Sequence, residues 1–289
     1  MEDLDKKTQE RNEAFTKVLT EMLEPHIPAI QIGLVKFGQW LEKVKTDLAP
    51  LLLKIAQTDW KAVQARLESM PARSREVMSR ASAQGWFFNW ENSLEEVLNL
   101  IESLQTANTD EVDEILKTHY TKDMDWYVIQ LANAYPDRKQ AIAAAVNAHK
   151  NYGTEGYYIS IPVFLAQADG IFSEITGITS AMDKVRNSDV IKGSAWVQNI
   201  IGDNEEVKDL LYQLLNLHTM DILKSKGQRD KESREKGKIF DALNRHQVMH
   251  GEVSNYGTEL NSFKAFSFLA FIGLHVPGML NSPRLRHDN

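Results

Sequence analysis

Apolar residues recur along this chain with the three- and four-residue spacing of α-helices. The clearest run extends from Leu34 to Ile55, where apolar positions follow one another in alternating steps of three and four. Such a run places its apolar side chains on one helix face. We expect that face to be buried in an antiparallel bundle rather than to form a free dimeric zipper. Pro50 lies inside the run and predicts a kink or a break after Leu48.

The same helical spacing covers most of the chain, and the alternating pattern of strands is almost absent. We therefore predict an all-α fold, built as a multi-helix bundle. Further helices are expected over residues 6–23, 60–70, 74–83, 93–104, 110–120, 125–134, 137–152, 156–176, 181–201, 205–224, 231–250 and 259–272. The stretch 157–161 resembles a short strand, but it leads into a proline and has no partner strand, so a helix is favoured there as well.

Capping and helix-breaking residues mark several expected helix ends. Asn204 and Thr258 precede helices and are of the type that caps a helix N-terminus. Gly227 and Gly251 are expected to end the helices before them. A boundary near Pro136 divides the chain into an N-terminal helical region, residues 1–135, and a C-terminal helical domain, residues 136–289.

Composition narrows the class of protein. With 289 residues, of which 43% are hydrophobic and 25% charged, the chain has the balance of a soluble globular protein with a sizeable core. It contains no cysteine, which excludes disulfides, thiolate metal sites and a cysteine nucleophile. The N-terminus is acidic and lacks the apolar segment of a secretory signal. The most apolar run, 265–280, is interrupted by His275 and Pro277, so no membrane span is expected and we predict a cytoplasmic protein.

Charge is unevenly distributed along the chain. The net charge of −7 argues against a general nucleic-acid coat, because such binding depends on neutralising phosphates. The segment 224–245, however, carries eight basic and four acidic residues. This basic strip could guide a polyanion toward the residues that follow it. The alternative is a solvated helix face with internal ion pairs, such as Lys231 with Glu235.

The segment that follows the basic strip combines a fixed cation with two titratable groups. Arg245, His246 and His250 lie within six residues, directly after Asn244. Arginine can grip two phosphate oxygens, and histidine exchanges protons near neutral pH. RNA carries its own nucleophile in the 2′-hydroxyl, so its cleavage needs only proton transfer and a cation near the phosphate. These residue types therefore make RNA cleavage the leading hypothesis.

Spacing restricts how these side chains can meet. Residues five apart are separated by about 140° around a helix, so Arg245 and His250 converge only if the helix ends between them or if a second protomer faces them. His246 and His250 are four apart and share a face, as helical metal ligands do. Asp241, Glu252 and His218 are candidates for a third ligand, but the pattern is incomplete, and we expect no metal and no cofactor. The alternative is a structural cluster in which the histidines cap the helix and Arg245 pairs with an acid.

The motif in which Arg245 and a polar residue precede His250 resembles the signature of the HEPN superfamily of helical domains, many of which are metal-independent ribonucleases. Longer segments are similar to uncharacterised bacterial HEPN-like proteins: GWFF at 85–88, YISIPVFLAQADGI at 158–171, LNRHQVMHG at 243–251, NYGTE at 255–259 and NSFKAFS at 261–267. The resemblance covers residues 85–273. It implies a HEPN-like C-terminal domain that acts as an endoribonuclease toxin or hydrolase in phage defence or stress.

By this resemblance Arg245 and His250 form the catalytic pair, and His246, Asn244 and Asp169 are supporting residues. The resemblance also implies RNA as partner and a homodimer whose two motifs face each other across the interface. Some members of the superfamily carry a regulatory tyrosine two residues after the histidine, where this chain has Glu252 instead. Other members are inactive, so a silent RNA-binding, protein-binding or oligomerisation module remains the alternative. The N-terminal region could bind a protein partner or an activator.

An aromatic cluster at residues 86–90 has two interpretations. Trp86, Phe87, Phe88 and Trp90 could form a platform on which bases stack. Packing in the core is favoured, because large aromatic side chains dominate the buried junctions of helices.

Overall fold

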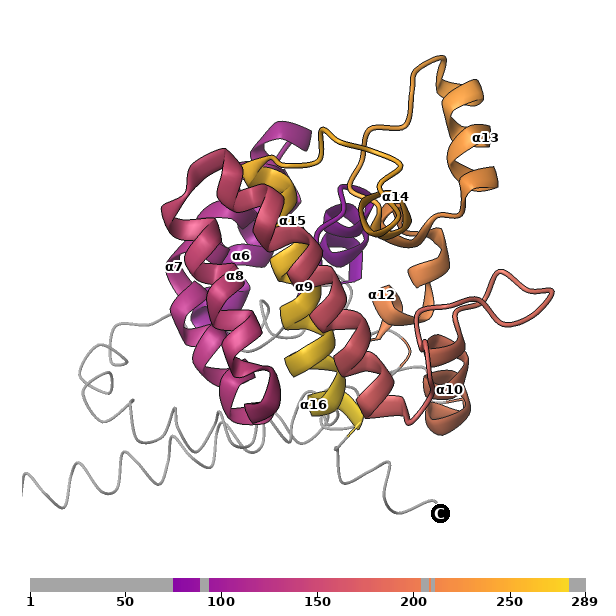
Figure 1. Cartoon of the computed structure of the whole chain (residues 1–289), viewed down its shortest axis with the longest axis horizontal. Helices are drawn as coiled ribbons and strands as arrows, with labels where there is room; N and C mark the ends of the chain where they lie inside the picture. Colours follow the sequence, from indigo (N-terminus) through magenta and orange to yellow (C-terminus); the bar gives the residue numbers. More distant parts are fainter. Residues whose placement is uncertain (1–74, 89–93, 204–207, 209–210, 281–289) are drawn as a thin grey trace, which may run out of the picture. The chain divides into compact units, whose positions relative to one another are not determined.

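The computed structural model describes residues 75–88, 94–203, 208 and 211–280 (Figure 1). The helices expected over 6–23, 34–55 and 60–70, and the cap expected at Asn204, lie outside these residues. The described residues are mainly helical and contain no β-strand; Lys184 and Ile191 form an isolated β-bridge. The predicted all-α fold is therefore confirmed for the part of the chain that the structure describes.

Four long helices form the centre of the described structure. They are α7 (Thr109–Ala134), α8 (Lys139–Asn151), α9 (Gly153–Thr176) and α15 (Glu259–Ala270). The helix α9 packs along both α8 and α15, and α7 covers the other side of α8 and α15 (Figure 1). The stretch 157–161 lies inside α9, so the preference for helix over strand was correct.

The C-terminal helical run is the most completely buried part of this core. After α15 the chain continues through a π-helical turn η5 (Phe271–His275) into α16 (Val276–Leu280). The run Glu259–Leu280 is long and apolar enough to cross a membrane, and 78% of its most apolar window is buried inside the fold. A helix that is apolar all round is expected at the centre of a bundle, and α15 occupies that place between α7 and α9.

The segment 86–88 supplies the aromatic side chains that fill the space beside α15. Trp86, Phe87 and Phe88 are each at most 2% exposed. The ring centroid of Phe87 lies 4.6 Å from that of Phe268. The Gln213 side chain accepts the Phe88 N–H at 3.0 Å and donates to the Trp86 carbonyl at 3.1 Å. The packing interpretation of these three aromatic residues is confirmed; Trp90 lies outside the described residues.

Several expected helix boundaries were correct and others were wrong. Residues 75–83 are helical, and α6 (Leu94–Thr106) matches the expectation closely. The expected pair 110–120 and 125–134 is one helix, α7, because nothing between them breaks the helix and the buried face continues through Tyr120, Met124 and Tyr127. A short 3-10 turn, η2 (Pro136–Arg138), precedes α8.

The region 181–224 is much less helical than its apolar spacing suggested. Only α10 (Lys192–Ile201) forms within the expected helix 181–201, because residues 181–191 fold into a turn with Asn187 at a positive φ of 60°. Within the described residues 211–224 of the expected helix 205–224, the chain instead forms α12 (Tyr212–Leu215) and two 3-10 turns, η3 (Leu217–Thr219) and η4 (Asp221–Leu223). Short apolar runs fit a buried turn as well as a helix, and here packing selects the turns.

The helix expected over 231–250 is in fact two helices, α13 (Lys226–Lys236) and α14 (Arg245–Met249). Gly237 ends α13 in the left-handed region, at φ 64°. Gly227 lies in the first turn of α13, so the expectation that it ends a helix was wrong. Thr258 caps α15 as predicted, accepting the Asn261 N–H at 3.1 Å.

The expected domain boundary near Pro136 lies inside a compact part of the chain. Arg73–Asn289 form one compact unit, which contains the helices on both sides of that residue. Contacts of α7 with α8 and α15 join the two sides. Whether residues 136–289 can fold without the helices before them stays a prediction.

A buried histidine joins three of the central helices. His149 of α8 is 7% exposed, and its Nδ1 shares a hydrogen bond of 2.8 Å with the Ser262 hydroxyl of α15. That hydroxyl shares a second hydrogen bond of 2.8 Å with Ser160 of α9. Burial lowers the pKa of His149 to about 4, an effect only partly opposed by the nearby Glu259 carboxylate. At neutral pH the imidazole is therefore uncharged.

We predict that this histidine makes the fold sensitive to acid. The unfolded chain protonates His149 below its usual pKa of 6.5, whereas the folded chain does so only near 4. Its stabilising contribution is therefore complete above pH 6.5 and is lost as the pH falls toward 4, by about 3 kcal/mol. Urea unfolding of the wild type and of His149→Gln at about pH 7.5 and about pH 4.5 should show a weaker pH dependence in the variant. Equal pH dependence in both proteins would contradict the assignment.

Candidate functional site

The candidate residues lie on and around the short helix α14. Asn244 caps its N-terminus, with its side-chain oxygen accepting the Gln247 N–H at 3.2 Å. The helix ends at Met249 with His250 as C-cap, and Gly251 follows at φ 68°. The expectation that Gly251 ends the helix directly after His250 is confirmed.

Asn244 has a structural role that extends beyond its cap. Its side chain is 1% exposed and donates to the carbonyls of Asp221 at 2.6 Å and Lys224 at 3.0 Å. Its oxygen also accepts from Arg229 Nη1 at 3.0 Å. These contacts fix the start of α14 to η4 and α13. The residue supports the site by positioning the helix that carries it.

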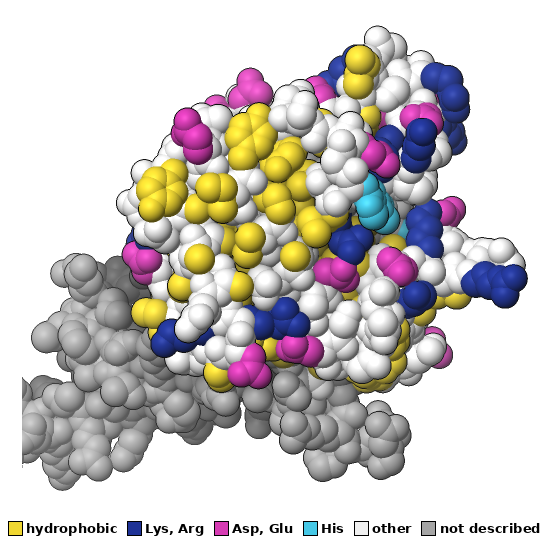
Figure 2. All heavy atoms as spheres, viewed as in Figure 1, with side chains coloured by type: hydrophobic (Ala, Val, Ile, Leu, Met, Phe, Trp, Pro, Cys, Tyr) yellow, Lys and Arg dark blue, Asp and Glu magenta, His cyan; other side chains and the backbone are white. Residues whose placement is uncertain are grey.

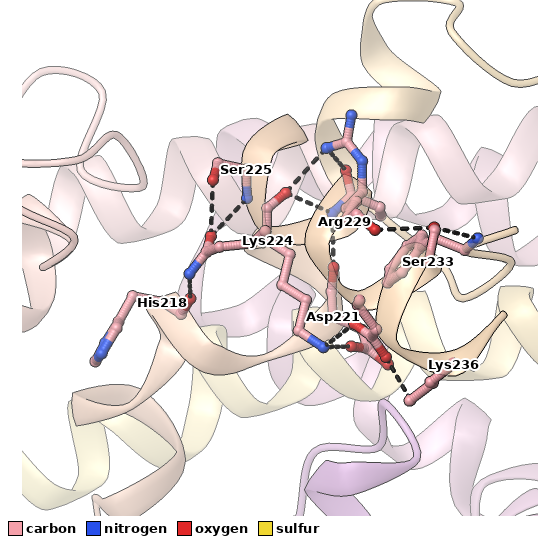
Figure 3. A network of polar contacts seen from close by, with 11 residues as sticks. His218, Asp221, Lys224, Ser225, Arg229, Ser233 and Lys236 are labelled. Carbon is pink, nitrogen blue, oxygen red and sulfur yellow. Dashed lines mark hydrogen bonds and ion pairs between the residues drawn. The ribbon is translucent and has the colours of Figure 1, made fainter. Parts of the chain in front are cut away.

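Arg229 is the buried centre of this anchoring network, which Figure 3 shows together with its neighbours. Its side chain is 4% exposed, donates to the Lys224 carbonyl at 2.9 Å and forms an ion pair of 2.6 Å with Glu252. It therefore joins the beginning of α13 to the residues directly after α14. Sequence reasoning counted Arg229 only as one of eight basic residues, and no local signal distinguishes it from its exposed neighbours.

Most of the basic strip is paired with acids. Lys224 lies 2.5 Å from Asp221 and 2.6 Å from Glu232, and Lys236 lies 2.5 Å from Glu232 (Figure 3). Hydrogen bonds from these two lysines lower the pKa of Glu232. The expected pair of Lys231 with Glu235 is present at 3.8 Å. The geometry therefore favours the ion-paired interpretation of the strip over that of a free cationic surface.

Arg245 binds Asp169 directly, through Nη2 and Oδ2. Asp169 lies on α9, so this ion pair connects α14 to the central bundle. Both side chains are largely buried, at 15% and 21% exposure. Arg245 Nε and Asp169 Oδ1 are buried and have no hydrogen-bond partner among the described residues. The structure brings these two candidates together in the way expected if Arg245 pairs with an acid.

A second arginine packs against the glycine that follows Asp169. The guanidinium of Arg138 lies across Gly170, where a Cβ atom would come within 2.5 Å of its Nη1. Arg138 also donates to Gln167 at 2.9 Å and forms an ion pair of 2.5 Å with Glu174. Two arginines therefore hold α9 at neighbouring positions, which gives a packing reason for the Asp-Gly sequence.

The two histidines of α14 lie face to face. The imidazole centroids of His246 and His250 are 5.9 Å apart and the ring planes differ by 12°. Their four-residue spacing therefore brings them together as predicted. Burial lowers the pKa of His246, and the positive charges of Arg245 and His250 lower it further. A lowered pKa favours the neutral form of the His246 imidazole.

The described residues contain no group of three or more His, Cys, Asp or Glu side chains that could hold a metal ion. The acids considered as a third ligand have other partners: Asp241 lies 3.5 Å from Lys238, and Glu252 pairs with Arg229. The cluster itself supplies imidazole and guanidinium groups.

Comparisons with family models, curated proteins and solved structures give no match for this chain. The resemblance of the motif residues to HEPN proteins therefore stays an expectation from the sequence.

The ion pair between α9 and α14 can be tested by a double-mutant cycle. We expect Asp169→Asn and Arg245→Gln each to destabilise the fold, because each leaves its partner largely buried without a counter-charge. The double variant should lose less than the sum, with a coupling free energy of about 1–2 kcal/mol in urea unfolding. Additive effects would show that the two side chains do not stabilise the contact.

Proposed function

We propose that this protein is a metal-independent endoribonuclease that leaves a 2′,3′-cyclic phosphate, acting in the cytoplasm. The observation that carries the proposal is the stacked pair of imidazoles, 5.9 Å apart, on a helix that also carries Arg245, whose charge acts on His246. Two proton-transfer groups and a cation on one short helix are sufficient for attack by the 2′-hydroxyl. The HEPN-like motif supports the same chemistry.

The reaction assigns a different task to each histidine. His246, whose pKa is lowered, is neutral at physiological pH and accepts the 2′-hydroxyl proton. The 2′-oxygen then forms a bond to phosphorus, and the bond from phosphorus to the 5′-oxygen breaks. His250, exposed at the end of α14, donates a proton to that leaving oxygen. His246 gains one proton and His250 loses one. Both histidines return to their starting states by exchanging protons with water.

Arg245 would stabilise the charge that develops on the phosphate. Its Nη2 is already held by Asp169, and its Nε has no hydrogen-bond partner among the described residues. Asp169 therefore acts as a positioning residue, which fixes the guanidinium beside the histidines. The charge of the pair is balanced, so Arg245 contributes through directed hydrogen bonds more than through net positive charge.

The proposal includes a homodimer in which a second copy of the motif completes the cleft. Exposed apolar side chains lie on α9, including Ile159 at 54% exposure, and on α14, where Met249 is 42% exposed. Figure 2 shows this apolar area over α9 extending to the histidine side chains near α14. Such a surface supports association of two copies. Phage defence or stress is the setting that the HEPN-like motif suggests.

A silent RNA- or protein-binding module is the second candidate. The ion pair of Arg245 with Asp169 and the pairing of the basic strip favour it, because both reduce the free positive charge around the histidines. The two candidates make different demands on the histidines: the nuclease needs the imidazoles for proton transfer, whereas a binding module does not.

We expect the purified protein to cleave mixed cellular RNA in the presence of EDTA and to leave 2′,3′-cyclic phosphate ends. Arg245→Ala and His250→Ala should each reduce the rate by about 100-fold or more, because each removes a group required in the transition state. His246→Ala should remove the acidic limb of the pH–rate profile, which lies below the usual pKa of histidine. Matched controls are His218→Ala and Arg186→Ala, which change the same residue types outside α14.

Equal cleavage by wild type and the α14 variants would identify a contaminating nuclease and contradict the proposal. RNA that stays intact in every sample, while it still binds the protein, would favour the silent binding module.

A further inference from the structure

Tyr158 is an aromatic side chain that is held in place yet exposed at the surface. The ring of Tyr256 packs edge-on against it, with centroids 5.0 Å apart and planes at 71°. The Tyr256 hydroxyl donates to the Tyr158 carbonyl at 3.3 Å. Gly257 packs so closely on the Tyr158 ring that a Cβ atom there would lie 2.5 Å from the ring carbons. With these contacts the ring has little freedom to move, but 37% of the residue remains exposed.

The position of this ring relates it to the candidate site. Tyr158 and Asp169 are eleven residues apart on α9, which corresponds to about three helical turns: a rotation of about 20° and a rise of about 16 Å. The two residues therefore lie on one face of α9. Pro162 and Leu165 lie between them on that face, and Leu165 is fully buried in the core, so it does not separate them at the surface.

The chain after α14 connects the same two places. From His250, at the end of α14, it returns within six residues to Tyr256, which contacts Tyr158. The aromatic pair and the candidate site are therefore connected both by α9, which carries Tyr158 and Asp169, and by the short segment 250–256. An extended strand with its phosphate at Arg245 would reach Tyr158 within a few nucleotides.

We propose that Tyr158 is a stacking subsite for an unpaired nucleobase of the RNA strand whose phosphate is bound at α14. This inference rests on the proposed function and deepens it by naming single-stranded RNA as the substrate class. Every base has a π-face, so the subsite is tolerant of sequence. Stacking also explains how a chain with a net charge of −7 and a largely ion-paired basic strip holds a polyanion: a part of the affinity comes from contacts that need no free cation.

The inference is tested with an oligonucleotide that binds without being cleaved. The probe is a fluorescent 2′-O-methyl RNA octamer, which lacks the attacking hydroxyl, and the readout is fluorescence anisotropy. Tyr158→Ala should weaken binding by about 5- to 150-fold, the range for loss of one stacked base. Tyr158→Phe should restore it, because the ring stacks without its hydroxyl. The salt dependence of binding should be the same in wild type and Tyr158→Ala, since no phosphate contact is removed.

A second set of probes places an abasic nucleotide at each position of the octamer in turn. The wild type should lose affinity for the probe that lacks the stacked base, and Tyr158→Ala should not distinguish that probe from the complete octamer. Tyr152→Ala is the matched control. Tyr152 is 55% exposed at the N-terminus of α9 and is not part of the proposed subsite. Thermal unfolding of each variant shows whether the fold is retained.

Three results would overturn the subsite. They are unchanged affinity in a folded Tyr158→Ala variant, failure of the wild type to bind the octamer, and dissociation of a dimer by Tyr158→Ala without a change in binding per subunit. The last result would assign the ring to an interface between two copies of the chain. Failure of the proposed nuclease activity would give a different result. Unmodified RNA would stay intact, although the octamer still binds in a way that depends on Tyr158.

Discussion

The contact between Arg245 and Asp169 is the constraint on which the candidate site depends. It ties α14, a helix of five residues, to the central helix α9. A helix this short has almost no stability of its own, because its few hydrogen bonds do not compensate for the cost of starting it. The remainder of the bundle holds α9 in place through α8 and α15, so the geometry of the site follows from the core.

A second set of contacts also holds α14 in place. Asn244 joins its first turn to η4, and Arg229 links Asn244 to Glu252 on the other side of the helix. Removal of Asn244 would take away the acceptor of the Gln247 N–H, and removal of Arg229 would break the ion pair with Glu252. The imidazoles of His246 and His250 are therefore presented from a helix that is fixed at its start, along one side and at its end. This is the arrangement that proton transfer at one phosphate requires.

Sequence reasoning reached the fold class and the helices with an unbroken buried face, such as α9 and α15, because periodicity is a local property. It also predicted the end of α14 from Gly251 and the meeting of His246 with His250 from their spacing. It missed the break between α13 and α14, although Gly237 and Asn244 are suitable residues for a helix end and a cap. The HEPN-like pattern named Asp169 as a supporting residue, but its contact with Arg245 joins positions 76 residues apart, and no spacing rule reports such a contact.

The most direct test of the central claim is to observe the imidazoles while RNA binds. Nitrogen-15 NMR of labelled histidines can be recorded during titration with an uncleavable 2′-O-methyl RNA. If His246 and His250 act together on one phosphate, both signals should shift along a single binding curve while the signal of His218 stays constant, and Arg245→Gln should weaken that curve. RNA binding that leaves both imidazole signals unchanged would contradict the account and remove α14 from the binding site.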